Sequence, residues 1–192
     1  MNIAVIFAGG VGKRMHSKEC PKQFLKIYNK PIIIHTLEYF EKHPLIDAIV
    51  ISCVEEWMPY LEELIYKYRI EKVKKVVVGG ETGQLSIYNG LKAAEDVANG
   101  EKAIVLIHDG VRPLINAKLI TDNIESVKKN GSAITTAVVK ETILVVNGVC
   151  QVFCVSFKKN FYGEGNLPIV RVLYFYKLTR QSILDKHLHF IV

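Results

Sequence analysis

The segment IAVIFAGG (residues 3–10) decides the fold. Five apolar residues, most of them branched or aromatic, are followed within one residue by two glycines. A short continuous apolar run is typical of a strand buried on both faces, as in a parallel sheet. The glycines predict a tight turn after that strand, where the backbone can approach a ligand without a side chain in the way.

Similar apolar runs recur at intervals of about thirty residues, and segments with helical spacing separate them. We predict strands over residues 3–7, 48–54, 74–78, 103–107 and 133–139, and helices over residues 32–40, 57–68, 86–98 and 119–129. The alternation indicates an α/β fold, a doubly wound α/β/α sandwich with a mainly parallel sheet. Ligands of such sheets bind outside the carboxyl ends of the strands, and the unusual motifs of this chain follow predicted strands.

A chain of 192 residues has room for one well-buried domain. Its net charge of +6 is uneven, because residues 147–192 hold six Lys and Arg against two Asp and Glu. The nearly neutral remainder argues against a nucleic-acid partner and favours a nucleotide-sized anion. Residues 147–192 also show clustered aromatics and poor periodicity, with one predicted helix near 180–187. We expect a nucleotide-binding domain over 1–146 and an atypical tail over 147–192, translated out of frame or poorly ordered.

The four cysteines, Cys20, Cys53, Cys150 and Cys154, lack the spacing of a metal site and are expected to be free thiols. The N-terminus has neither the basic region nor the cleavage site of a signal peptide. No apolar stretch reaches the length of a membrane span. We predict a cytoplasmic protein without a membrane partner.

The glycine turn continues as AGGVGKRM (residues 8–15) and is followed by PKQF (residues 21–24). Backbone N–H groups in such a turn can reach phosphate oxygens. Arg14 and Lys22 bring two cations to the same loop, where they would stabilise the charge that develops when a phosphate is attacked. The alternative is a tight turn with solvated basic residues.

The spacing of the glycines does not match two other nucleotide-binding motifs. A Walker loop would need glycine at position 7 and Ser or Thr at position 14, where this chain has Phe7 and Arg14. A dinucleotide fingerprint would need a third glycine where this chain has Met15. The second failure argues against a nicotinamide-dependent reductase.

Two further motifs follow the third and fourth predicted strands. GGETGQLS (residues 79–86) has small and polar residues that leave room for a base, although it could be a plain loop with Ser86 near a helix N-cap. In HDGVRP (residues 108–113), Asp109 could hold Mg²⁺ against phosphates and Arg112 could donate to them. The alternative is an Asp109–Arg112 pair in a turn. KET (residues 140–142) carries little signal by itself.

Taken together, GGVGKRM, PKQF, GGETGQLSI and HDGVRP resemble the motifs of the cytidylyltransferases that act on ribitol 5-phosphate and on methylerythritol 4-phosphate. The resemblance covers about residues 1–145. It implies a GT-A-like nucleotidyltransferase fold, CTP and a polyol phosphate as substrates, Mg²⁺ as cofactor and a homodimer.

The resemblance also assigns roles to single residues. Arg14 and Lys22 would stabilise the transition state, Asp109 would bind Mg²⁺, and Thr142 would lie near the acceptor. The acceptor's own phosphate oxygen attacks, so no protein nucleophile is required. CTP would be held by residues of three loops: Phe7, Ala8, Gly9, Gly10, Gly12, Gly80, Glu81, Thr82, Gly83, Gln84, Leu85, Ser86, Gly110 and Arg112.

Two departures favour ribitol 5-phosphate or a similar alditol phosphate as the acceptor. Gly83 stands where many methylerythritol enzymes have Arg, and eight positions separate Arg14 from Lys22. A third departure concerns residues 147–192, where the family's dimerisation arm and acceptor-phosphate Arg are not recognisable. The alternatives are a methylerythritol phosphate enzyme and a CTP-binding remnant without catalysis.

Overall fold

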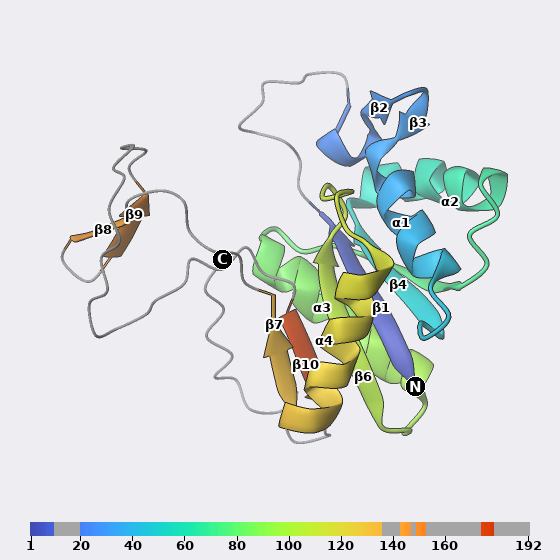
Figure 1. Cartoon of the computed structure of the whole chain (residues 1–192). Helices are drawn as coiled ribbons and strands as arrows, with labels where there is room; N and C mark the ends of the chain where they lie inside the picture. Colours follow the sequence, from blue (N-terminus) through green and yellow to red (C-terminus); the bar gives the residue numbers. More distant parts are fainter. Residues whose placement is uncertain (10–19, 136–142, 147–148, 153–173, 179–192) are drawn as a thin grey trace.

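The computed structural model describes residues 1–9, 20–135, 143–146, 149–152 and 174–178 (Figure 1). The main sheet contains six strands: β1 (Asn2–Ala8), β4 (Ala48–Cys53), β5 (Val73–Val78), β6 (Ala103–Asp109), β7 (Ser132–Ile134) and β10 (Tyr174–Leu178). Their order is β5-β4-β1-β6-β10-β7. Strands β5, β4, β1 and β6 pair in parallel, whereas β10 runs antiparallel to both β6 and β7. The mainly parallel sheet confirms the predicted fold class.

Four helices connect and cover these strands: α1 (Ile32–Lys42), α2 (Met58–Lys67), α3 (Gly83–Ala98) and α4 (Ala117–Asn130). Short 3-10 turns lie at η2 (Lys22–Phe24) and η3 (Glu55–Trp57). Two small hairpins complete the described part, β2 (Lys26–Ile27) with β3 (Lys30–Pro31), and β8 (Ile143–Val146) with β9 (Val149–Val152).

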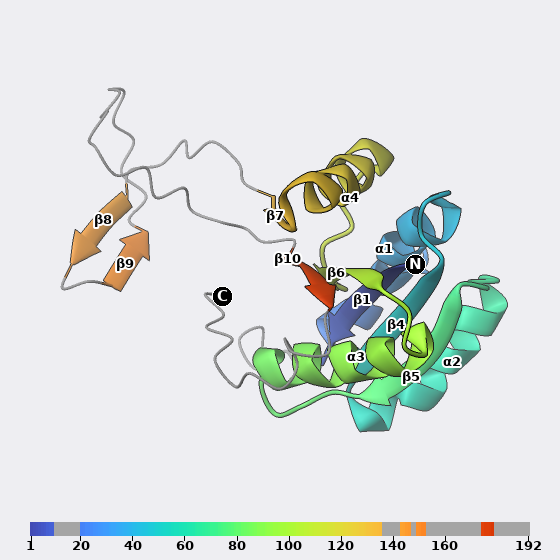
Figure 2. The same ribbon diagram turned by 90° about the horizontal axis from the view of Figure 1, so that it is seen from below.

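The central strand β1 is buried on both faces because its side chains alternate between two apolar clusters. Ala4 and Ile6 pack in a cluster with residues of α1, α2 and α4, whereas Ile3 and Val5 pack in a second cluster with residues of α3. Helix α3 accordingly lies on the opposite side of the sheet from α1 and α4 (Figure 2). The three-layer arrangement follows directly from this double burial.

Several element boundaries differ from the sequence prediction, and two of these differences concern the predicted motifs. Helix α3 begins at Gly83 rather than at residue 86, because the Thr82 side chain accepts a hydrogen bond from the Leu85 N–H and caps the helix there. The alternative in which Ser86 lies near the N-cap is therefore wrong, because Thr82 is the N-cap residue. Strand β6 runs on to Asp109, since the parallel ladder with β1 continues to the Phe7–Asp109 pair.

The region after residue 130 is described only in parts. Strand β7 matches the start of the fifth predicted strand, and its predicted continuation over residues 136–139 lies outside the described residues, as does the predicted helix near 180–187. The β8–β9 hairpin spans the predicted boundary at residue 146, and β10 from the tail range enters the main sheet. In the described part of the chain, no helix is long and apolar enough to cross a membrane.

Candidate functional site

The motifs that follow β1, β5 and β6 meet at one edge of the sheet. Ala8 pairs with Cys53, and Cys53 pairs with Val78, so β1, β4 and β5 end side by side. On the other side of β1, Phe7 pairs with Asp109 at the end of β6. Strand pairing therefore brings three predicted loops together at the carboxyl edge, where ligands of such sheets bind.

The loop after β1 touches the loop after β5 so closely that only glycine fits. A Cβ on Gly9 would lie 2.3 Å from Ser86 Oγ and 3.8 Å from the Gly79 Cα. Any side chain at position 9 would displace Ser86, which is fully buried. The first and second predicted motifs are therefore one packed unit.

Ser86 holds the loop that precedes its own helix. Its Oγ accepts a hydrogen bond from the Gly80 N–H at 3.0 Å, and it lies 3.0 Å from the Thr82 carbonyl oxygen, to which it can donate. The side chains between these residues, Glu81 to Leu85, are exposed at the N-terminus of α3. The positive end of the helix dipole thus faces the carboxyl edge, which suits an anionic ligand. Contact with CTP stays a prediction for the residues of this loop: Gly80, Glu81, Thr82, Gly83, Gln84, Leu85 and Ser86.

Lys22 lies beside the end of β1 because its neighbours are anchored there. Gln23 is buried and donates from Nε2 to the Ala8 carbonyl oxygen at 2.6 Å. Phe24 is buried as well and stacks on Trp57 with the ring centres 5.1 Å apart. Lys22 itself is half-buried. Sequence reasoning did not assign a role to Gln23, although the PKQF motif already contained it.

The turn after β6 carries Asp109 and Arg112 as an ion pair, with Arg112 Nε 3.2 Å from Asp109 Oδ2. Asp109 Oδ1 also accepts from the Val111 N–H at 3.1 Å. The pairing considered as the alternative from the sequence is therefore present. The Asp109 side chain keeps 21% of its surface exposed, so the carboxylate is partly accessible to solvent.

The accessible Asp109 carboxylate fits Mg²⁺, which proteins commonly hold through one or two carboxylates together with substrate phosphates. Among the described residues, no group of three or more His, Cys, Asp or Glu is placed to hold a metal. A site made only of protein ligands is therefore not formed by that part of the chain, and Asp109 as a magnesium ligand stays a prediction.

His108 is a buried, neutral support of the same turn. Burial lowers the pKa of its ring, and its Nε2 donates to the Arg112 carbonyl oxygen at 2.9 Å. The ring lies 5.4 Å from the Phe40 ring, and within the described residues its Nδ1 finds no hydrogen-bond partner. A buried imidazole that donates to a backbone carbonyl orients the turn rather than transferring protons to a substrate.

Cys53 is not suited to act as a nucleophile of this site. Cys20 and Cys53 are free thiols, as predicted. Burial raises the pKa of Cys53 to about 11, although it ends β4 at the carboxyl edge. A thiol that stays protonated is a poor nucleophile.

Four predicted site residues lie outside the described part of the chain: Gly10, Gly12, Arg14 and Thr142. Seven of the described site residues lie at or next to the strand ends that form the carboxyl edge: Phe7, Ala8, Gly9, Lys22, Gly80, Asp109 and Gly110.

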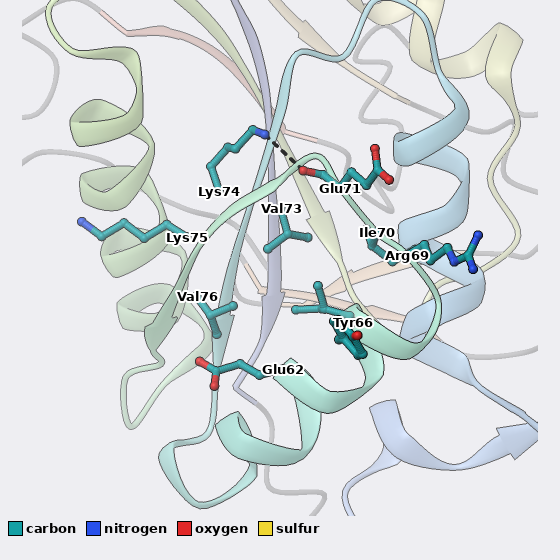
Figure 3. A pocket seen from close by; sticks show the side chains of 10 residues that line it. Glu62, Tyr66, Arg69, Ile70, Glu71, Val73, Lys74, Lys75 and Val76 are labelled. Atoms are coloured by element: carbon teal, nitrogen blue, oxygen red, sulfur yellow. Dashed lines mark hydrogen bonds between the residues drawn. The ribbon is translucent and has the colours of Figure 1, made fainter.

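A hollow of about 690 Å³ lies elsewhere, between α2 and the outer edge of β5 (Figure 3). Its walls include Tyr66 of α2, Arg69 and Glu71 of the connection, and Val73 and Val76 of β5. The residues of β5 that line it precede the carboxyl end of the strand at Val78. This hollow is therefore separate from the edge where the motifs meet.

Comparison with known proteins agrees with the motifs at this edge. The family model of 2-C-methyl-D-erythritol 4-phosphate cytidylyltransferase (IspD) matches residues 2–159. The chain belongs to this family. The predicted enzyme class, a cytidylyltransferase, is thereby confirmed.

Two relatives of this cytidylyltransferase chain carry the name ribitol-5-phosphate cytidylyltransferase. The protein of Streptococcus agalactiae serotype Ia is 56% identical over 180 residues, which cover 89% of this chain and 75% of the relative. The protein of Vibrio parahaemolyticus is 58% identical over 147 residues, which cover 77% of this chain and 61% of the relative.

A solved structure of similar fold is 4-diphosphocytidyl-2C-methyl-D-erythritol synthase from Anaerococcus prevotii. It matches with a TM-score of 0.70 at 23% identity, over 92% of this chain and 69% of that one. This likeness supports the cytidylyltransferase fold and says nothing further about the site.

Proposed function

We propose that this cytidylyltransferase transfers the CMP group of CTP to ribitol 5-phosphate and releases pyrophosphate. The observation that carries the proposal is the 56% identity, over 89% of the chain, to a relative named for ribitol 5-phosphate. A relative named for methylerythritol 4-phosphate, from Clostridium acetobutylicum, is 42% identical over 76% of the chain. Gly83, which replaces an arginine of many methylerythritol enzymes, supports the same choice.

The chemistry needs no protein nucleophile. An oxygen of the acceptor phosphate attacks the α-phosphorus of CTP and forms a new P–O bond. The bond from the α-phosphorus to the bridging oxygen breaks, and its electron pair leaves with pyrophosphate. Negative charge grows on the leaving group, so cations held at the carboxyl edge lower the barrier.

Four residues would provide that stabilisation. Lys22, held beside the end of β1 by its anchored neighbour Gln23, would face the phosphates together with Arg14. Asp109 would hold Mg²⁺, which neutralises charge on the bound phosphates. The Asp109 carboxylate would exchange its contact with Arg112 for the metal, leaving that guanidinium to donate to phosphate oxygens.

Pyrophosphate release tests the proposal directly. The purified chain is incubated with CTP and Mg²⁺, and with ribitol 5-phosphate, methylerythritol 4-phosphate or no acceptor. We expect release with ribitol 5-phosphate at a kcat/KM at least tenfold above that with methylerythritol 4-phosphate. No release with either acceptor, despite CTP binding measured by calorimetry, would mean that the chain binds nucleotide without catalysis.

Methylerythritol 4-phosphate is the second candidate acceptor, because the matching family model carries that name. Preferential turnover of this compound in the same assay would assign the chain to isoprenoid synthesis instead. Replacing CTP by UTP in a parallel reaction tests the choice of nucleotide, and we expect little release.

We also propose an oligomeric state and a cellular location for the enzyme. We infer a homodimer from the family resemblance, to be measured by light scattering at several protein concentrations. We infer a cytoplasmic location, which the free thiols Cys20 and Cys53 support because thiols stay reduced in that compartment. Cell fractionation would test it.

A further inference from the structure

A buried side chain from α1 holds the backbone of the turn that carries Asp109. Thr36 is fully buried, and its Oγ1 donates to the Gly110 carbonyl oxygen at 3.1 Å across 74 positions of sequence. The Ile32 carbonyl oxygen, one helical turn earlier, is farther from the same hydroxyl, at 3.4 Å. The hydroxyl has one hydrogen, so we assign its hydrogen bond to the nearer acceptor, the Gly110 carbonyl oxygen.

The other side of Gly110 is fixed by β1. The Gly110 N–H donates to the Phe7 carbonyl oxygen at 3.0 Å. A Cβ on Gly110 would lie 3.3 Å from the Ala8 Cβ and 3.4 Å from the same Phe7 oxygen. Gly110 is thus enclosed between β1, which accepts from its N–H, and α1, which donates to its carbonyl oxygen. Its orientation depends on both elements.

Helix α1 also touches the segment that carries Lys22. The Ile32 N–H at the start of α1 donates to the Leu25 carbonyl oxygen at 2.9 Å, directly after η2. The same helix packs Phe40 against the His108 ring. One rigid element therefore contacts the Lys22 segment at its first residue and the Asp109 turn further along.

We propose that Thr36 is a positioning residue of the cytidylyl transfer: its hydroxyl, by holding the Gly110 carbonyl, sets the place of the Asp109 carboxylate at the carboxyl edge. The inference rests on the proposed function. Without the hydroxyl, the buried Gly110 carbonyl loses its partner, and an unmet buried acceptor favours a shift of the turn. A shifted carboxylate would hold the metal and the triphosphate less well.

A pair of substitutions distinguishes the role of the Thr36 hydroxyl from that of its methyl group. Thr36→Val keeps the branched shape and removes the donor, whereas Thr36→Ser keeps the donor and removes the methyl. Thr121→Val is the matched control, because the Thr121 hydroxyl lies 3.1 Å from His43 Nε2 and serves a different contact. A purely structural role predicts the same site properties for all three variants.

The first measurement is hydrogen exchange of the metal-free protein, followed in a peptide that contains residues 108–113. The Gly110, Val111 and Arg112 amides all donate hydrogen bonds in this turn, so their exchange reports its opening. We expect about tenfold faster exchange in Thr36→Val, and rates within about twofold of the wild type in Thr36→Ser and Thr121→Val. Unchanged exchange in Thr36→Val, or equal acceleration in Thr36→Ser or Thr121→Val, overturns the proposal.

The second measurement is the Mg²⁺ concentration that gives half-maximal CTP binding. It should rise several-fold in Thr36→Val and return to the wild-type value in Thr36→Ser, and pyrophosphate release should fall about tenfold in the first variant only. A wild type that binds CTP but turns over no acceptor contradicts the proposed function, and the exchange rates and the Mg²⁺ dependence still decide the role of Thr36.

Discussion

The loop after β5 and the turn after β6 lie at the same edge of the sheet, and they are held in different ways. Ser86 and Thr82 hold the loop after β5 through hydrogen bonds to residues three to six positions away. The turn after β6 is held by Thr36, from 74 positions away, and by the Phe7 carbonyl of β1. The loop after β5 is thus held mainly by local side-chain hydrogen bonds, although Gly9 packs against Ser86 and the Gly79 N–H donates to the Cys53 carbonyl oxygen. The turn after β6 also has local hydrogen bonds, but contacts from α1 and β1 hold it as well.

This difference suggests a division of labour. The exposed side chains Glu81 to Leu85 of the loop after β5 can adjust to a base, while Ser86 keeps the start of the loop in place. A turn enclosed between β1 and α1 keeps one carboxylate in place, as electrostatic stabilisation of a transition state requires. Substitutions in the turn should therefore affect turnover, and substitutions in the loop should affect mainly the binding of CTP.

The largest effect is expected from Asp109→Asn. The change removes the proposed magnesium ligand, and we expect turnover to fall about 100-fold or more at saturating CTP. The melting temperature should change little, because the Arg112 side chain of the ion pair is half exposed and asparagine keeps an oxygen that can accept from the Val111 N–H. Asp96→Asn, which breaks the exposed pair with Lys75, is the control and should stay active. Equal activity of both variants would remove the proposed metal site.

Lys22→Ala extends the comparison to the segment of η2, which α1 contacts as it contacts the turn after β6. Loss of a cation that faces the leaving group should lower turnover by about two orders of magnitude. Lys26→Ala, on the exposed β2 strand, serves as the control and should be close to the wild type. Steady-state pyrophosphate release measures both, and a fully active Lys22→Ala would contradict the transition-state role.

Ser86→Ala tests the local side of the comparison. The Gly80 N–H loses its acceptor in a packed site, which should cost about 1–3 kcal/mol of unfolding free energy. We expect CTP to bind about tenfold more weakly by calorimetry, with kcat at saturating CTP within about threefold of the wild type. A large loss of kcat with unchanged CTP affinity would contradict the division between loop and turn.

The smallest effect concerns pH and His108. Burial lowers the pKa of this ring below the ordinary value of 6.5, so below about pH 6.5 the unfolded chain binds a proton that the folded chain does not. Stability should therefore fall as the pH drops from 6.5 towards the lowered folded value. His108→Gln cannot titrate and keeps an N–H donor for the Arg112 carbonyl. Urea unfolding at pH 7 and pH 5 should show a smaller loss for this variant than for the wild type.

Much of the fold was predictable because strands buried on both faces leave a clear signal. The run at residues 3–7 predicted β1, and the helical spacing that follows each strand predicted α1 to α4. The start of α3 was missed because the capping bond of Thr82 to the Leu85 N–H depends on loop geometry, and Ser86 offered an equally suitable side chain four positions later. The buried roles of Gln23 and Thr36 were missed because a hydrogen bond to a distant carbonyl leaves no periodic pattern.

The sequence by itself determined the kind of sheet and the motifs that follow its strands, because apolar runs and glycine turns are local properties of the chain. The tertiary structure decided which side chains support those motifs. Thr36 meets Gly110, and Gln23 meets Ala8, only when α1 and η2 pack against the sheet. A buried carbonyl must find a donor wherever the fold brings one, and contacts between distant segments form only on folding.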